Sequence, residues 1–215
     1  IVRQRLREVW PDVRGMTVVG LGYATPFLEP FRAEAARTIA AMPATQGVLH
    51  WPREGPGLTV LTEELELPLP DLSVDRLLMV HYLESAEQIR PALREAWRVL
   101  SGQGRLLVVA PNRRGLWARF ERTPFGHGRP YSMGQLTRLL RDTMFTPVRS
   151  SAALFMPPVA WPVATAAAPA WERLGAWGLS AFAGAVMIEA TKQIYAAQPV
   201  PKAVRRLGFA SPAQR

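Results

Sequence analysis

A loop rich in arginine and aromatic residues, Asn112–Tyr131, carries the side chains best suited to chemistry. It holds five arginines, four aromatic residues and one histidine, His127, set among glycines. Guanidinium groups bind carboxylates or phosphates, and a histidine can accept a proton as a general base. We therefore take His127 and Tyr131 as candidate catalytic groups beside an anionic or apolar substrate. Two alternatives stay open: a helix at Leu116–Phe120 packed on the core, and a loop that stacks on single-stranded nucleic acid.

Further polar residues follow the predicted strands. Gly22 and Tyr23 come after the first strand, Glu63 after the third and His81 after the fourth. In an open α/β sheet, ligands bind beyond the carboxyl ends of the strands. We therefore expect these residues to lie close together at one edge of a sheet.

Short apolar segments alternate with helical ones along the chain. This alternation predicts an α/β fold with a mostly parallel central sheet and helices on both faces. The predicted strands are Met16–Leu21, Gly47–Trp51, Leu58–Thr62, Asp75–Val80, Arg105–Ala110, Phe145–Phe155 and Gly184–Tyr195. Ala185–Thr191, in the last of these, could also be helical.

The helices are predicted from apolar side chains spaced 3.6 residues apart. They are Val2–Val9, a helix from Glu29 to Met42 stopped by Pro43, a helix from Pro91 to a stop at Gly102, and one opened by a capping box of Ser132 and Gln135.

The spacing between two of the predicted strands conflicts with a parallel sheet. Only Pro52–Gly57 separates Trp51 from Leu58. A parallel crossover needs about a dozen residues or more. Gly47–Trp51 and Leu58–Thr62 therefore form a hairpin, or one of them is not a strand.

Composition excludes several kinds of chemistry. The chain has 215 residues and no cysteine, which excludes disulfides, cysteine zinc sites, iron–sulfur clusters and thiol catalysis. No metal site is predicted. The formal net charge is +9, which suggests an anionic partner, although the arginines are spread along the chain. Because no Lys/Arg run exceeds two residues, a coding bias toward arginine is the favoured explanation of the charge. A nucleic-acid partner is not expected, since a single arginine–aromatic loop is its only support.

We expect a single domain over residues 1–198, with a helical insertion at 156–183 before the last strand and a Pro/Arg-rich tail at 199–215. Prolines and two central charges argue against a membrane span in the apolar segment 155–188. That segment is the expected surface for a protein partner, a second copy or peripheral membrane contact. With no signal peptide at Ile1–Trp10, a cytoplasmic location is expected.

Four segments occur in a characteristic order: Gly20-Leu21-Gly22, Glu63–Asp71, Ser73–His81 and Ala96–Asn112. Their order and residues resemble the class I S-adenosylmethionine-dependent methyltransferases, in particular the branch that often methylates small molecules. The resemblance covers about residues 13–147. It implies a Rossmann-like methyltransferase fold, S-adenosylmethionine as cofactor and a small-molecule acceptor.

Carried over position by position, the resemblance implies cofactor contacts at Gly20, Gly22, Tyr23, Glu63, Leu65 and His81. Gly22 matches a glycine of the cofactor loop. Glu63 matches an acid that contacts the adenine amino group, and His81 a position that lines the cleft. From the residues alone, Glu63 could equally be a solvated acid and His81 a packed side chain.

The sequence also departs from the family pattern. Gly20 occupies an acidic position, while Ala24 and Pro26 replace two loop glycines. After the second strand, placed at Gly47–Trp51, a ribose-binding carboxylate and the following helix are missing. The leading hypothesis is a methyltransferase acting on a small molecule. The alternative is a catalytically inactive relative that binds or regulates another protein.

Overall fold

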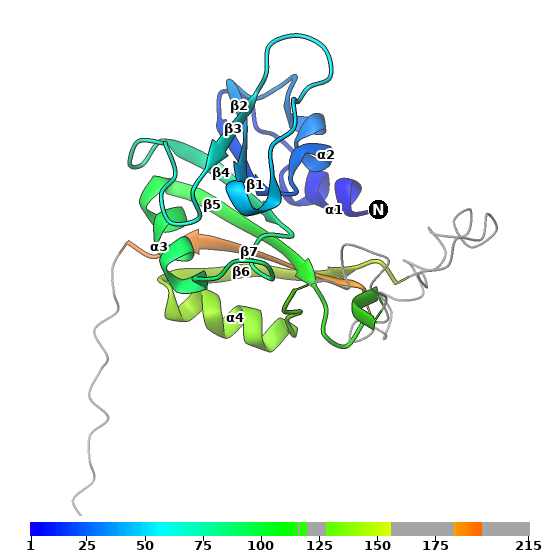
Figure 1. Cartoon of the computed structure of the whole chain (residues 1–215). Coiled ribbons are helices and arrows are strands. Elements are labelled where there is room, and N and C mark those ends of the chain that lie inside the picture. Colours follow the sequence, from blue (N-terminus) through cyan, green and yellow to red (C-terminus); the bar gives the residue numbers. More distant parts are fainter. Residues whose placement is uncertain (116, 120–127, 156–182, 195–215) are drawn as a thin grey trace, which may run out of the picture.

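A seven-stranded sheet forms the centre of the chain (Figure 1). The computed structural model describes residues 1–115, 117–119, 128–155 and 183–194. Within these residues the strands lie in the order β3-β2-β1-β4-β5-β7-β6. Their bounds are β1 Thr17–Gly22, β2 Arg37–Pro43, β3 Thr59–Thr62, β4 Val74–Val80, β5 Leu100–Pro111, β6 Phe145–Ala153 and β7 Ala185–Lys192.

The first five strands run parallel, and β7 runs antiparallel between β5 and β6. The predicted α/β class and mostly parallel sheet are therefore confirmed. Because β1 to β5 share one direction, their carboxyl ends meet at a single edge. Tyr23, Glu63 and His81 follow β1, β3 and β4 at that edge, and Gly22 is the last residue of β1.

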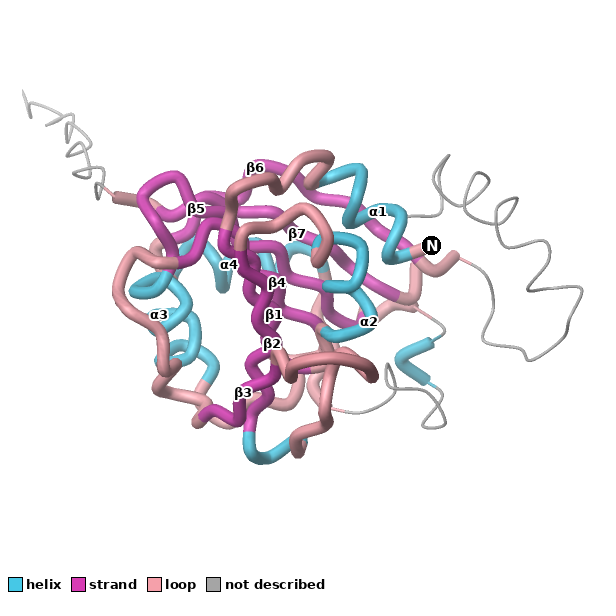
Figure 2. The backbone as a smooth tube through the Cα atoms, turned by 90° about the horizontal axis from the view of Figure 1, so that it is seen from above, coloured by secondary structure: helices cyan, strands magenta, loops and turns pink. Residues whose placement is uncertain are grey.

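Helices cover both faces of the sheet (Figure 2). Helices α1 (Val2–Val9) and α2 (Thr25–Leu28) pack on one face, and α3 (Ile89–Val99) and α4 (Met133–Asp142) pack on the other. The Ser132–Gln135 capping box at the start of α4 is present as predicted. Three 3-10 turns complete the described elements: Glu29–Phe31, Ala44–Gln46 and Trp117–Arg119.

The helix predicted from Glu29 to Met42 is wrong. Only the 3-10 turn Glu29–Phe31 forms there, and Arg37–Pro43 is the second strand, β2. Ile39 and Met42 lie at a helical spacing from Phe31, but they belong to a continuous apolar run, Ile39–Pro43. Parallel pairing of β2 with β1, from Thr17↔Arg37 to Leu21↔Ala41, satisfies its backbone and buries both its faces.

The strand predicted at Gly47–Trp51 is also wrong. Those residues are irregular, and the predicted Leu58–Thr62 strand is present as β3. The spacing conflict is thereby resolved, since one of the two segments is not a strand. Residues 44–58 connect the parallel strands β2 and β3 with a single 3-10 turn and no α-helix. Trp51 closes this connection by packing into the core.

Two further predictions are settled at β5 and β7. Gly102 does not end a helix, because α3 stops at Val99 and β5 runs through Gly102. Both late strands are confirmed, and the helical alternative for Ala185–Thr191 is wrong, since β7 pairs on both sides. The first four residues of β7, Ala185–Ile188, are apolar and fully buried between β5 and β6.

Several expectations fall outside the described residues. They concern His127, residues 156–182 of the predicted insertion, and the tail at 199–215. Among the helices that are described, none has the length and apolar character needed to cross a bilayer.

Arg98 on α3 holds the loop that follows β3. Its guanidinium donates to the carbonyls of Leu67 and Leu69 at 3.0 Å and forms ion pairs with Glu95 and Asp71. Hydrogen bonds from Arg98 lower the pKa of Glu95, which also accepts from the Leu67 amide. The loop that begins at Glu63 is thus anchored at its far end.

We predict that Arg98→Ala lowers the free energy of unfolding by about 1–3 kcal/mol at pH 7, because Glu95 and two carbonyls lose their donor. The folded-state pKa of Glu95 lies below its unfolded value near 4.5. The deficit should therefore be present above pH 4.5 and shrink as the pH falls further. Urea unfolding at several pH values measures it. Arg90→Ala, which breaks the exposed Arg90–Asp142 pair, is the control and should cost no more than about 1 kcal/mol. Equal losses from both variants would contradict the prediction.

Candidate active site

The turn after β1 brings backbone to the carboxyl edge in a conformation that glycine favours. Gly22 has φ of +81°, and a Cβ there would lie 2.6 Å from the Val80 carbonyl oxygen. The next amide, of Tyr23, donates to that same oxygen at 2.8 Å. β1 and β4 therefore leave the sheet in close contact. The tight turn also matches the glycine loop inferred from the sequence.

Gly20 has no space for the acid that the family pattern places there. A Cβ on Gly20 would stand 2.5 Å from Ala24 Cβ and 2.7 Å from Leu28 Cδ1. Ala24 and Leu28, at the start and end of α2, are fully buried against β1. The missing carboxylate is therefore a consequence of how closely α2 packs on the strand.

His81 and Glu84 form a buried pair after β4. His81 Nδ1 lies 2.6 Å from Glu84 Oε1, and the side chains are 10% and 4% exposed. His81 also has φ of +51°, a left-handed conformation that is uncommon for residues other than glycine. This sharp bend turns the chain as it leaves the sheet. The residue-by-residue assignment from the sequence included His81 and gave no role to Glu84, which follows the same strand three residues later.

Two buried oxygens at this edge have no hydrogen-bond partner within the described part of the chain. They are Thr62 Oγ1, at the end of β3, and Glu84 Oε2. Buried acceptors without partners are uncommon in folded proteins and call for a ligand, an ion or water. Together with the Gly22 turn, they fit a polar ligand that lies across the ends of β1, β3 and β4.

Three of the predicted cofactor residues present exposed side chains around that position. Glu63 is exposed, while Tyr23 and Leu65 are 51% and 42% exposed. The ring centroids of Tyr23 and His81 are 6.5 Å apart. The structure thus brings Gly22, Tyr23 and His81 together, and Glu63 and Leu65 follow β3 two strands away at the same edge.

Tyr82 ties the β3 and β4 exits to each other. Its hydroxyl donates to the Glu64 carbonyl at 3.0 Å, and burial raises the pKa of this phenol above its usual value. The Glu64 carboxylate accepts from the Glu87 amide at 3.1 Å. Neither contact had a sequence signal, because each joins residues far apart along the chain.

Tyr131 is the last residue of the arginine-rich loop. Its hydroxyl donates to the Leu83 carbonyl at 3.2 Å, and its backbone pairs with Pro111 and Arg113. Burial raises the pKa of Tyr131, so its hydroxyl stays protonated at neutral pH. In this position Tyr131 holds the β4 and β5 exits together. Its proposed catalytic partner His127 is not among the described residues.

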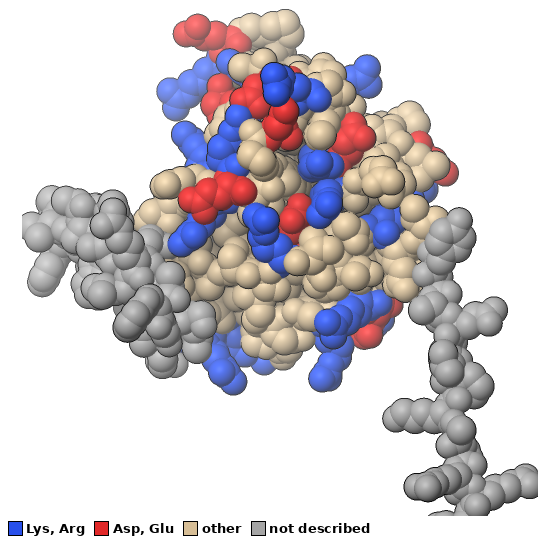
Figure 3. Space-filling model, turned by 180° about the vertical axis from the view of Figure 1, so that it is seen from behind, with Lys and Arg blue, Asp and Glu red and all other residues tan. Residues whose placement is uncertain are grey.

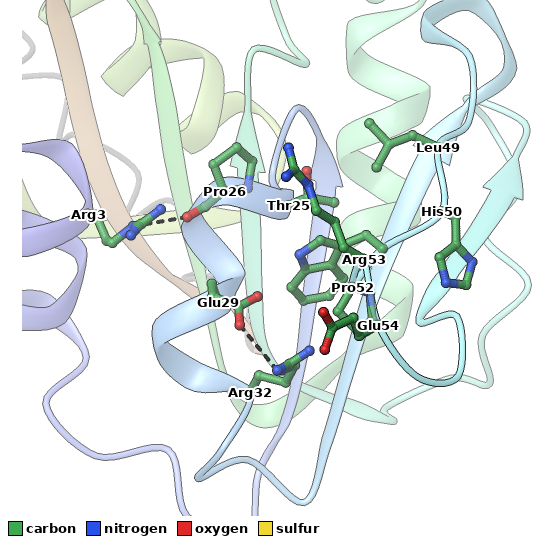
Figure 4. A pocket seen from close by; sticks show the side chains of 11 residues that line it. Arg3, Thr25, Pro26, Glu29, Arg32, Leu49, His50, Pro52, Arg53 and Glu54 are labelled. Atoms are coloured by element: carbon green, nitrogen blue, oxygen red, sulfur yellow. Dashed lines mark hydrogen bonds and ion pairs between the residues drawn. The ribbon is translucent and has the colours of Figure 1, made fainter.

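A cavity of about 620 Å³ lies apart from this edge cluster, between α2 and the segment Leu49–Glu54 (Figure 4). Its lining includes Arg3, Arg32 and Arg53 but also Glu29 and Glu54, and Arg32 pairs with Glu29 at 3.3 Å. None of the predicted cofactor residues lines it.

Charge on the surface is mixed. On the face drawn in Figure 3, basic and acidic side chains are interspersed over the described residues. That face offers no continuous basic surface for a nucleic-acid backbone. Within the described ranges, no group of three or more metal-ligating side chains comes together.

Comparisons with known proteins point in one direction. Residues 12–108 match the family model described as a methyltransferase domain. A relative in Mycobacterium tuberculosis, described as a probable S-adenosylmethionine-dependent methyltransferase, is 34% identical over 152 residues. The match covers 69% of this chain and 54% of that protein. The chain thus spans about half the length of the curated relatives it matches.

Solved structures share the fold. An S-adenosylmethionine-dependent methyltransferase from Archaeoglobus fulgidus has a TM-score of 0.63 at 20% identity, covering 89% of this chain and 93% of that one. A complex of the Haloferax volcanii Trm112 methyltransferase activator with a methyltransferase gives a TM-score of 0.66 at 14% identity, with 88% of each chain covered. At these identities the similarity concerns the fold alone.

We predict that Gly20→Ala lowers the free energy of unfolding by about 1–3 kcal/mol, because its methyl group would overlap Ala24 and Leu28. Gly134→Ala is the matched control. Gly134 is exposed on α4 with open space around it, so alanine there should stabilise by about 0.5–1 kcal/mol. Urea unfolding of both variants measures the difference. A Gly20→Ala protein as stable as the parent would show that α2 does not pack on β1 as described.

Proposed function

The chain belongs to the class I S-adenosylmethionine-dependent methyltransferase family, and we propose that it transfers a methyl group to a small molecule. The cofactor supplies that methyl on a positively charged sulfur. The observation that carries the proposal is the cluster at the carboxyl edge, where the Gly22 turn adjoins the His81–Glu84 pair and β3 ends in Thr62 beside Glu63. Sheet order, family match and relatives support the same activity.

The chain's own residues have separate tasks in this proposal. The Gly22 turn lets backbone approach the ligand without a side chain between them. Glu63 accepts a hydrogen bond from the adenine amino group, and Leu65 and Tyr23 supply apolar surface. His81 lines the cleft, with its ring orientation held by Glu84. Gly20 contributes by leaving room for α2 rather than by contact.

The acceptor is proposed to bind where β5 leaves the sheet. Arg113, Arg114 and Arg129 are exposed there on either side of the arginine-rich loop, and Tyr131 lies close to them along the chain. Guanidinium groups in this position favour an acceptor with a carboxylate or phosphate. His127 remains the proposed proton acceptor, with Tyr131 as the residue that positions the loop. A protein partner through segment 155–188 also remains a proposal.

Calorimetric titration with S-adenosylhomocysteine and S-adenosylmethionine tests the proposed site directly. We expect binding of at least one ligand at micromolar concentration. Absence of heat at millimolar ligand would overturn the methyltransferase proposal for the isolated chain and favour the inactive alternative. Activity assays with candidate anionic acceptors follow only after binding is measured.

We predict that Glu63→Ala weakens S-adenosylhomocysteine binding by about 1–3 kcal/mol, roughly 5- to 150-fold, because the adenine amine loses its acceptor. Glu66→Ala is the control, since Glu66 is an exposed acid three residues further along the same loop. It should bind as the parent does. If both substitutions weakened binding equally, Glu63 would not contact the cofactor, and the loss of affinity would reflect only the change in net charge.

A further inference from the structure

Gln46 connects two loops across the candidate cofactor site. It is the last residue of the 3-10 turn Ala44–Gln46, which directly follows β2. Its side-chain amide donates to the His81 carbonyl at 2.9 Å and to Ser85 Oγ at 2.7 Å. An amide NH2 has two hydrogens to donate, so both are used. We call this pair of contacts the Gln46 bridge.

The sheet order requires the bridge to pass over the end of β1. β2 and β4 are not neighbours, because β1 lies between them and pairs with both in parallel. Adjacent strands are about 4.8 Å apart, so a link from β2 to β4 spans roughly 10 Å. Gln46 therefore lies across the strand end from which the Gly22–Tyr23 turn emerges, which is where the proposed cofactor would bind.

The Gln46 bridge occupies an acceptor to which a ligand with hydrogen-bond donors could bind, the His81 carbonyl. The His81 carbonyl accepts hydrogen bonds, and the unpartnered Glu84 Oε2 is buried three residues further on. The neutral Gln46 amide donates to the His81 carbonyl, where an ammonium group would form a stronger, charge-assisted hydrogen bond and would also be attracted by the nearby Glu84 carboxylate. An amino acid-like end of a ligand carries such a group.

The bridge is also built to open. All three residues of the Ala44–Gln46 turn are exposed, so water can replace each contact. Thr45 adds one further link, to Glu64 at 3.4 Å. Exposed hydrogen bonds contribute little net free energy each, because water competes for both partners. A ligand with a cationic group can therefore displace them.

We propose that the Gln46 bridge closes the cofactor site and must open before S-adenosylmethionine binds. The proposal rests on the proposed methyltransferase function. The closed chain is the resting form, and the ammonium end of the cofactor replaces the Gln46 amide at the His81 carbonyl. Apparent affinity is reduced by the fraction of molecules that are open, so weakening the bridge tightens binding.

Gln46→Ala in the full chain tests the bridge, with S-adenosylhomocysteine as the calorimetric probe. We expect the apparent Kd to fall roughly 3- to 30-fold, the range expected from the loss of one or two solvent-exposed hydrogen bonds. Ser85→Ala removes one of the two acceptors and should give a smaller gain. Gln103→Ala, at an exposed glutamine on β5, is the matched control and should leave Kd unchanged.

The gain should appear mainly as faster association in stopped-flow measurements, because opening precedes binding. Equal Kd values for Gln46→Ala and the parent would overturn the bridge while leaving the cofactor site in place. Weaker binding by Gln46→Ala would also overturn it, since Gln46 would then be a ligand contact. No binding by either protein would overturn the proposed function itself, and the bridge with it. Thermal melting of each variant confirms that a change in Kd does not reflect unfolding.

Discussion

The contact between Gly20 and helix α2 governs the first half of the structure. Without a side chain on Gly20, Ala24 and Leu28 reach the surface of β1, and the chain turns back after only a few residues. A short helix leads quickly into β2, and β2 delivers the Ala44–Gln46 turn to the carboxyl edge. The missing acid at position 20, the abbreviated helix and the position of Gln46 are therefore parts of one packing arrangement.

Much of the fold could be predicted from the sequence where a segment is buried on both sides. The strands predicted at Asp75–Val80 and Arg105–Ala110 contain the continuous apolar runs Leu77–Val80 and Leu106–Ala110, and such runs in an alternating pattern indicate parallel central strands. The helix prediction for Arg37–Pro43 fails because Phe31, Ala35, Ile39 and Met42 happen to repeat near 3.6 residues. Local periodicity could not reveal that β1 offers this run a pairing partner, since that depends on tertiary structure.

The candidate site was predictable in part, for the same reason. Gly22, Glu63 and His81 were predicted as cofactor contacts because each directly follows a predicted strand and matches a family position. Glu84 was given no role, although it pairs with His81 in the same segment, and Gln46 was missed because its contacts join separate segments. The second strand is Arg37–Pro43 and not Gly47–Trp51, so the position of the family's ribose-binding carboxylate moves to the residues after Pro43. The next three residues, Ala44, Thr45 and Gln46, are all neutral.

The place of β7 in the sheet has a consequence for biosynthesis. β6 pairs only with β7 among the described strands, and β7 also supplies the link to β5, joining Pro111 to Ala185. A ribosome releases β6 well before β7, so the newly made β6 has no neighbour to pair with. That half of the sheet can assemble only once residues near 192 have left the exit tunnel. Until then the edge of β5 that will pair with β7 is exposed, and its residues Leu106–Ala110 are apolar. Exposed apolar strand edges bind chaperones and promote aggregation.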